Sequence, residues 1–252
     1  MMRSDEAIVL GCQALGEADV IVTWIDREGA KVRGVARSAR SSRRRFGGAL
    51  EPMSRVTVRW TPREGRDLQR VDGIDLVRSH AAMQADPEMQ AACAVLSEVA
   101  GSLTREADDD SRVFRLLEAV LDALAAGADR LSTVRYFEYW MLRLHGLLPD
   151  LSTCAGCQGE LGAGGVWVGE SGGVVRCSKC ARAVAVPHRK LSTADVAFLG
   201  VAASTAPADL CAAGARAHPG GALESLLRGA IEGFLERRLR TYRHLNAAVL
   251  RG

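Results

Sequence analysis

The hydrophobic pattern of the chain changes its period near residue 80. Before that point, apolar residues form short runs or alternate with polar residues over 7–12, 19–25, 30–36, 53–60 and 68–76, which is typical of β-strands. Between the second and third segments, Asp26-Arg27-Glu28-Gly29 predicts a tight turn in which Gly29 supplies a positive φ. Five short strands with little helical pattern between them favour a small closed barrel. The OB-fold is the five-stranded barrel that commonly binds oligonucleotides.

After residue 80 the apolar positions recur at helical spacing. Asp86 and Pro87 predict the start of a helix that runs to about residue 104. Ser111 predicts the cap of a second helix, preceded by the acidic run 108–110, which we expect to complement the helix N-terminus. A third helix is predicted at 131–144, a capping-box-like start at 192–195, and a last helix at 223–250. The residues expected to face the core are Val113, Phe114, Leu117, Val120, Leu121 and Leu124 in the second helix, Phe137, Trp140, Met141 and Leu144 in the third, and Leu226, Leu227, Ile231, Phe234, Leu235, Leu239 and Tyr242 in the last.

The composition is that of an ordinary globular protein. Apolar residues make up 48% of the 252 positions and charged residues 25%, so a sizeable core is possible. We predict an α+β chain with an OB-fold barrel at 1–80 and a helical domain at 81–252 that carries an insertion at 150–186. The polar opening residues argue against a secretory signal, and no stretch is apolar enough to span a membrane. A cytoplasmic protein without a membrane partner is therefore expected.

Four of the seven cysteines form two Cys-x2-Cys pairs. They are Cys154, Cys157, Cys177 and Cys180. This spacing favours an all-cysteine zinc site, because thiolates are soft donors that suit tetrahedral Zn²⁺. Four protein ligands close the coordination shell, so we predict one structural Zn²⁺ rather than a catalytic one. Apolar residues at 166–168 and 174–175 predict a hairpin between the pairs, as in a zinc ribbon. Two disulfides or redox-active Cys-x2-Cys motifs are the alternatives.

The basic residues of the N-terminal third gather in one segment. Residues 1–80 hold 15 Lys and Arg against 11 Asp and Glu, whereas the rest hold 18 against 19. The candidate DNA-binding residues, with no acidic residue among them, are Lys31, Arg33, Arg37, Arg40, Arg43, Arg44 and Arg45. An arginine fork can bond two phosphate oxygens, so the segment predicts a nucleic-acid-binding loop. The alternative is a solvated basic face. Phe46 is a candidate for stacking on a base, although a buried ring is the more common outcome.

No enzymatic signature is evident along the chain. Phosphate-binding loops, dinucleotide-binding glycine motifs, nucleophile elbows and paired catalytic carboxylates are all missing from the pattern. We therefore predict that the protein is not an enzyme. A zinc-dependent hydrolase is the least favoured hypothesis, because a closed four-ligand shell leaves no position for water.

In the order of these features the chain resembles the RecO family of bacterial DNA-repair and recombination mediators. Residues 7–52, above all Glu17 to Pro52, carry the resemblance together with the CAGC and CSKC motifs, and it covers nearly the whole chain. The resemblance implies an N-terminal OB-fold, a helical body and, in many members, a four-cysteine zinc site. It also implies a nucleoid-associated, non-enzymatic protein that binds single- and double-stranded DNA and anneals complementary strands.

Further partners follow from the same resemblance. With RecR, such a protein promotes loading of RecA onto DNA coated by single-strand DNA-binding protein, whose acidic C-terminal tail it binds. The alternative is an RNA-binding, translation-associated protein, because OB-folds and zinc ribbons occur there too.

Overall fold

The computed structural model describes residues 1–41, 46–63, 65–106, 109–161, 165–169, 172–217 and 221–249. The chain divides along the sequence into two compact units, the first ending at Leu121 and the second beginning at Asp122. The α+β class is confirmed, with a barrel first and helices after it. The domain boundary predicted at residue 80 stays a prediction. Within the described ranges, none of the helices is long and apolar enough to cross a bilayer.

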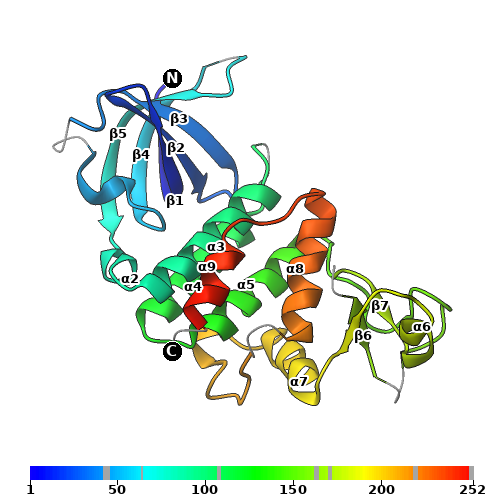
Figure 1. The fold of residues 1–252 in the computed structure, drawn as a ribbon. Helices are drawn as coiled ribbons and strands as arrows, with labels where there is room; N and C mark the ends of the chain where they lie inside the picture. The colour runs from blue at the N-terminus through cyan, green and yellow to red at the C-terminus, as the bar shows by residue number, and fades with distance from the viewer. Residues whose placement is uncertain are drawn as a thin grey trace. The chain divides into compact units, whose positions relative to one another are not determined.

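The first unit is built on a closed five-stranded barrel (Figure 1). Its strands are β1 (Arg3–Leu15), β2 (Asp19–Asp26), β3 (Lys31–Ala36), β4 (Arg55–Thr61) and β5 (Gln69–Arg78). They are ordered β1-β2-β3-β5-β4, and only the β3–β5 pair is parallel. The barrel closes because the long β1 pairs with β4 along its first half and with β2 along its second. This is the predicted OB-fold.

The barrel interior is filled by the inward-facing residues of the alternating strands. Trp24 and Trp60 pack edge to face inside it, with ring centroids 6.1 Å apart. Gly34 lets β3 approach these rings, because a Cβ there would lie 2.7 Å from Cγ2 of Val71. The predicted turn before β3 is confirmed, with Gly29 at a φ of +97°.

The first unit also contains α2 (Ala81–Gln84), α3 (Pro87–Leu103) and most of α4 (Ser111–Ala125). Asp86 caps α3 as predicted, its carboxylate accepting from the Glu88 amide at 2.9 Å. Ser97 of α3 donates to the carbonyl of Leu10, which lies at an irregularity in the pairing of β1 with β2. The predicted cap of α4 is wrong by one residue, because Asp110 rather than Ser111 accepts from the amide of residue 112. Asp108 lies outside the described residues.

The second unit holds the remaining helices. They are α5 (Arg130–Leu144), α7 (Thr193–Ala202), α8 (Ala222–Leu235) and α9 (Tyr242–Val249), with a short 3-10 turn at Pro207–Asp209. The single last helix predicted at 223–250 is wrong, because Glu236 adopts a left-handed φ of 51° and ends α8. Phe234 is 48% exposed, contrary to its predicted place in the core. In α5, Phe137 and Met141 are buried as predicted, but Trp140 and Leu144 are only half-buried.

The cysteine-bearing insertion forms a small module within the second unit. It consists of β6 (Trp167–Gly169), β7 (Val175–Arg176), the helical turn α6 (Ser178–Arg182) and β8 (His188–Lys190). The predicted hairpin is confirmed as the antiparallel β6–β7 pair. β8 was not predicted; it joins the other edge of β6, so the sheet order is β7-β6-β8. Gly172 allows the module to meet α8, because a Cβ there would lie 2.0 Å from the carbonyl oxygen of Ser225.

Candidate metal centre and nucleic-acid interface

The two Cys-x2-Cys pairs come together at one point. The Sγ atoms of Cys154, Cys157, Cys177 and Cys180 all lie within 4.8 Å of one another. Tetrahedral Zn²⁺ with Zn–S bonds of about 2.3 Å separates its sulfurs by roughly 3.8 Å. The Cys157 and Cys177 sulfurs are 3.9 Å apart, and all four cysteines are free thiols. The donor set and its spacing therefore fit one thiophilic metal ion, as the sequence predicted.

Short backbone hydrogen bonds shape both halves of this cluster. The first pair lies in a tight loop in which the amide of Gln158 donates to the Cys154 carbonyl at 2.9 Å. The second pair spans the end of β7 and the start of α6, with Cys177 directly before that helical turn. Gly156 brings the halves together, because a Cβ there would lie 2.9 Å from Arg176 Nη1 and 3.0 Å from Cys180 Cβ.

Backbone amides also donate hydrogen bonds to the cysteine sulfurs and favour their thiolate form, which binds a cation. The amides of Cys177 and Gly156 donate to the Cys154 sulfur at 3.2 and 3.4 Å. Hydrogen bonding from backbone amides, with Cys177 first and then Cys157 and Gly156, lowers the pKa of Cys154 to about 6. The Cys180 amide likewise lowers the pKa of Cys177, whereas contact with the Cys177 and Cys157 side chains raises the pKa of Cys180 to about 12. Thiolate is the form that binds metal, so Cys154 is ready as a ligand at neutral pH.

The predicted basic segment begins on the outer face of β3. Gly34 and Ala36 point into the barrel, so Lys31 and Arg33 point outward. The ammonium of Lys31 donates to the Gly101 carbonyl at 2.8 Å and so joins β3 to α3. Arg33 is half-buried. Arg37 and Arg40 are exposed beyond the end of β3. The predicted residues Arg43, Arg44 and Arg45 lie outside the described residues.

Arginines elsewhere on the barrel are mostly ion-paired. Arg55 pairs with Glu6 and Glu118, Arg59 with Asp75, and Arg70 with Asp72. In the described part of the chain, by contrast, no carboxylate lies within ion-pair distance of Arg33, Arg37 or Arg40. The charges of these side chains are therefore not neutralised by a carboxylate in the described ranges, although the Arg40 guanidinium donates to the Glu17 carbonyl at 3.2 Å.

Phe46 follows the basic segment and is 2% exposed within the barrel core. Its ring is surrounded by barrel residues, so the alternative of a buried ring is confirmed. Stacking of Phe46 on a base would require it to leave the core.

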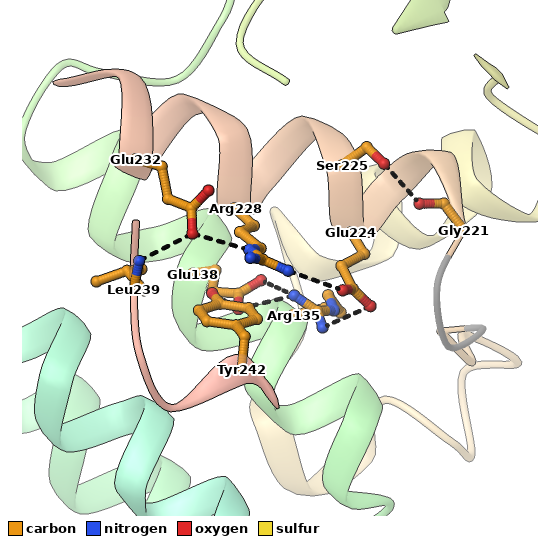
Figure 2. Close-up of polar contacts among 9 residues, drawn as sticks. All are labelled: Arg135, Glu138, Gly221, Glu224, Ser225, Arg228, Glu232, Leu239 and Tyr242. Carbon is orange, nitrogen blue, oxygen red and sulfur yellow. Dashed lines mark hydrogen bonds and ion pairs between the residues drawn. The ribbon is translucent and has the colours of Figure 1, made fainter. Parts of the chain in front are cut away.

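A buried ionic network in the second unit was not predicted (Figure 2). Arg135 and Glu138 of α5 are 1% and 0% exposed, and Arg135 Nη1 lies 2.8 Å from Glu138 Oε1. Arg135 also pairs with Glu224 of α8 at 3.2 Å, and the Tyr242 hydroxyl donates to Glu138. Burial raises the pKa of Glu138 and Arg135 opposes that shift. The network ties α5, α8 and α9 together, and its burial closes it to a substrate.

The sequence offered no signal for this network. Arg135 and Glu138 stand three residues apart in a helix, a spacing that is common for ion pairs on exposed helix faces. Only the packing of α8 and α9 over that face shows that the pair is internal.

Fold and site together define an OB-fold protein with a helical body and a four-thiol centre, a class in which the barrel commonly binds nucleic acid. The family model described as Recombination protein O N terminal matches residues 1–80, and the model described as Recombination protein O C terminal matches residues 84–243. The chain therefore belongs to the RecO family of DNA repair proteins, and the resemblance found in the sequence is confirmed.

Individual relatives carry the same description. A DNA repair protein RecO of Koribacter versatilis (strain Ellin345) is 42% identical over 161 residues, which cover 64% of this chain and 66% of the relative. A DNA repair protein RecO of Anaeromyxobacter sp. (strain K) is 40% identical over 70% of each chain. A third, from Anaeromyxobacter sp. (strain Fw109-5), is 35% identical over 92% of this chain and 89% of the relative.

Proposed function

We propose that this protein is a non-enzymatic mediator of recombinational repair that binds single- and double-stranded DNA and anneals complementary strands. The observation that carries the proposal is the set of arginines on and after β3, Arg33, Arg37 and Arg40, whose charges have no carboxylate partner in the described ranges. Annealing requires only that phosphate repulsion is screened while the bases stay free to pair. Arginines on the outside of an OB-fold barrel meet that requirement without a catalytic group.

The four-thiol centre supports a second part of the proposal. It holds one structural Zn²⁺, because four thiolates leave no coordination position for a reacting water. The metal would stabilise an insertion that has little apolar core of its own. Family membership supports the remaining roles, which are a cytoplasmic, nucleoid-associated location, action with RecR in loading RecA, and contact with the acidic tail of single-strand DNA-binding protein.

An annealing assay with a matched pair of variants tests the proposal. Complementary oligonucleotides are annealed over a salt series, with and without single-strand DNA-binding protein. The variant Arg33→Ala/Arg37→Ala should anneal more slowly, and its slope of log affinity against log salt should fall by roughly 0.7 per lost contact to single-stranded DNA. The control Arg59→Ala/Arg70→Ala removes the same charge from ion-paired positions of the same barrel and should behave like the wild type.

Two outcomes would contradict the proposal. Wild-type protein that does not accelerate annealing at any salt concentration would overturn the annealing role. Equal losses in both variants would show that the barrel acts through net charge rather than through the β3 arginines. Preference for structured RNA over DNA would favour the translation-associated alternative.

A further inference from the structure

The sheet of the cysteine module aligns an indole ring between two cations. In the register of this sheet, Trp167 of β6 is the direct partner of Arg176 on β7 and of Lys190 on β8. Direct cross-strand partners project from the same face of a sheet. One row across the module therefore carries a guanidinium, an indole and an ammonium, in that order.

This row lies on the face opposite the apolar side of the sheet. The neighbouring row holds Val168 and Val175, which are 0% and 4% exposed, and the exposed Arg189 at its β8 edge. Trp167 and Arg176 are only half-buried and Lys190 is exposed. The row around Trp167 is therefore the more open face of the β6–β7 pair, although the Nε1 atom of the indole is itself buried.

Each of the two cations lies against a glycine at an edge of the row. Arg176 Nη1 lies against Gly156, where a Cβ would come within 2.9 Å of it. The Lys190 side chain crosses Gly165, where a Cβ would lie 2.4 Å from its Cε. Glycine at these two positions thus makes room for the side chains that flank Trp167.

The segment 172–194, which carries β7, α6 and β8, holds charges of one sign. Residues 172–194 contain no Asp or Glu. Their basic residues are Arg176, Lys179, Arg182, Arg189 and Lys190. Four thiolates around Zn²⁺ leave a net charge of about −2. The five basic side chains outnumber that charge, so an excess of positive charge remains along residues 172–194.

We propose that this face is a second site for single-stranded DNA, in which one base stacks on Trp167 while the adjoining phosphates contact Arg176 and Lys190. An aromatic ring beside cations is the usual means of holding single strands, because every base has a π-face and every nucleotide a phosphate. A duplex hides its base faces and does not fit this site. The inference rests on the proposed function for its ligand class, but it places the site in the other unit of the chain from the β3 arginines.

Intrinsic fluorescence tests the site in the full-length, zinc-loaded protein. Oligo-dT of about eight nucleotides, a length within the usual range for a single-strand site, is titrated while tryptophan emission is followed. Trp24 and Trp60 are buried in the barrel, and the half-buried Trp140 is present in both proteins, so the difference between the wild type and Trp167→Phe isolates the contribution of the module. The expected result is quenching of the wild type by oligo-dT but not by duplex of the same length, and loss of that quenching in Trp167→Phe.

Affinity is measured in the Arg33→Ala/Arg37→Ala background, so that the barrel contributes little. There, Trp167→Ala should raise the Kd for oligo-dT about 5- to 150-fold. Lys190→Gln should raise the Kd and lower the salt slope by roughly 0.7. Arg182→Gln, which removes a charge from α6 in the same module, should leave both unchanged. A content of one zinc ion per chain in each variant shows that the module is folded. If Trp167→Ala fails to bind zinc, the effect of Lys190→Gln on the Kd and on the salt slope still tests the site.

The outcomes separate this inference from the proposed function. Wild-type binding with unchanged quenching in Trp167→Phe, or equal quenching by duplex, overturns the module site and leaves the barrel role standing. Equal effects of Lys190→Gln and Arg182→Gln also overturn it, because they would reflect net charge alone. A wild type that binds no DNA overturns both.

Discussion

Replacing Arg135 with methionine tests whether the buried network holds the second unit together. Methionine keeps much of the length of the side chain but removes the cation between Glu138 and Glu224. Both carboxylates are almost fully buried, and among the described residues Glu138 would keep only the Tyr242 hydroxyl as a donor. Breaking one side of a buried ion pair typically costs about 3–5 kcal/mol. We expect a loss of that size in the free energy of unfolding, measured by urea titration with far-ultraviolet circular dichroism.

The pH dependence of this loss provides a second measurement. Burial already raises the pKa of Glu138, and removing Arg135 removes the charge that opposes this shift. A carboxyl whose pKa is higher in the folded than in the unfolded state favours folding when protonated, so its contribution is present at low pH and lost as the pH rises. The deficit of Arg135→Met relative to the wild type should therefore be larger at about pH 8 than at about pH 5.5.

Two further variants serve as controls. Arg143→Met makes the same change at an exposed position of α5, where the guanidinium lies 4.9 Å from the centre of the Trp140 ring, and it should cost less than about 1.5 kcal/mol. Arg135→Met/Glu138→Leu removes the orphaned carboxylate and should recover part of the loss, because apolar replacement of buried ion pairs is often tolerated. The reasoning is refuted if the free energy of unfolding of Arg135→Met lies within about 0.5 kcal/mol of the wild-type value, which is the size of an ordinary surface change.

Two more predictions concern the metal centre and the barrel. The variant Cys177→Ser should no longer bind one zinc ion per chain and should melt at a lower temperature, while DNA binding by the barrel persists. The control Cys211→Ser should retain its zinc. The structural role would be contradicted if metal analysis found folded Cys177→Ser fully loaded with zinc, or folded wild type without metal. Gly34→Ala should destabilise the barrel by about 1–3 kcal/mol, because the added Cβ would lie 2.7 Å from Val71 Cγ2. In the control Gly11→Ala the added Cβ would have no atom within 4 Å, so the free energy of unfolding should hardly change. Equal unfolding free energies for the two glycine variants would show that β3 can shift at little cost.

Local patterns determined much of what the sequence could show about this protein. Alternating apolar residues marked the barrel strands, because a strand with one buried face must alternate. The spacing of the Cys-x2-Cys pairs predicted the thiol cluster, because two intervening residues suffice to turn both sulfurs toward one point. The capping residue Asp86 and the turn glycine Gly29 were also readable, since each acts through its immediate neighbours.

Features that depend on distant segments needed the tertiary structure. The Arg135–Glu138 pair looked like a surface pair until α8 and α9 covered it, and Lys31 looked like part of a DNA-binding face until α3 supplied a carbonyl for its ammonium. The row of Arg176, Trp167 and Lys190 exists only because β8 joins the sheet, and its three residues of strand carry too weak a pattern to predict. The sequence alone determined which residues could form strands, helices and a metal site. The tertiary structure decided which charges are buried and which are paired, because these depend on segments far apart along the chain.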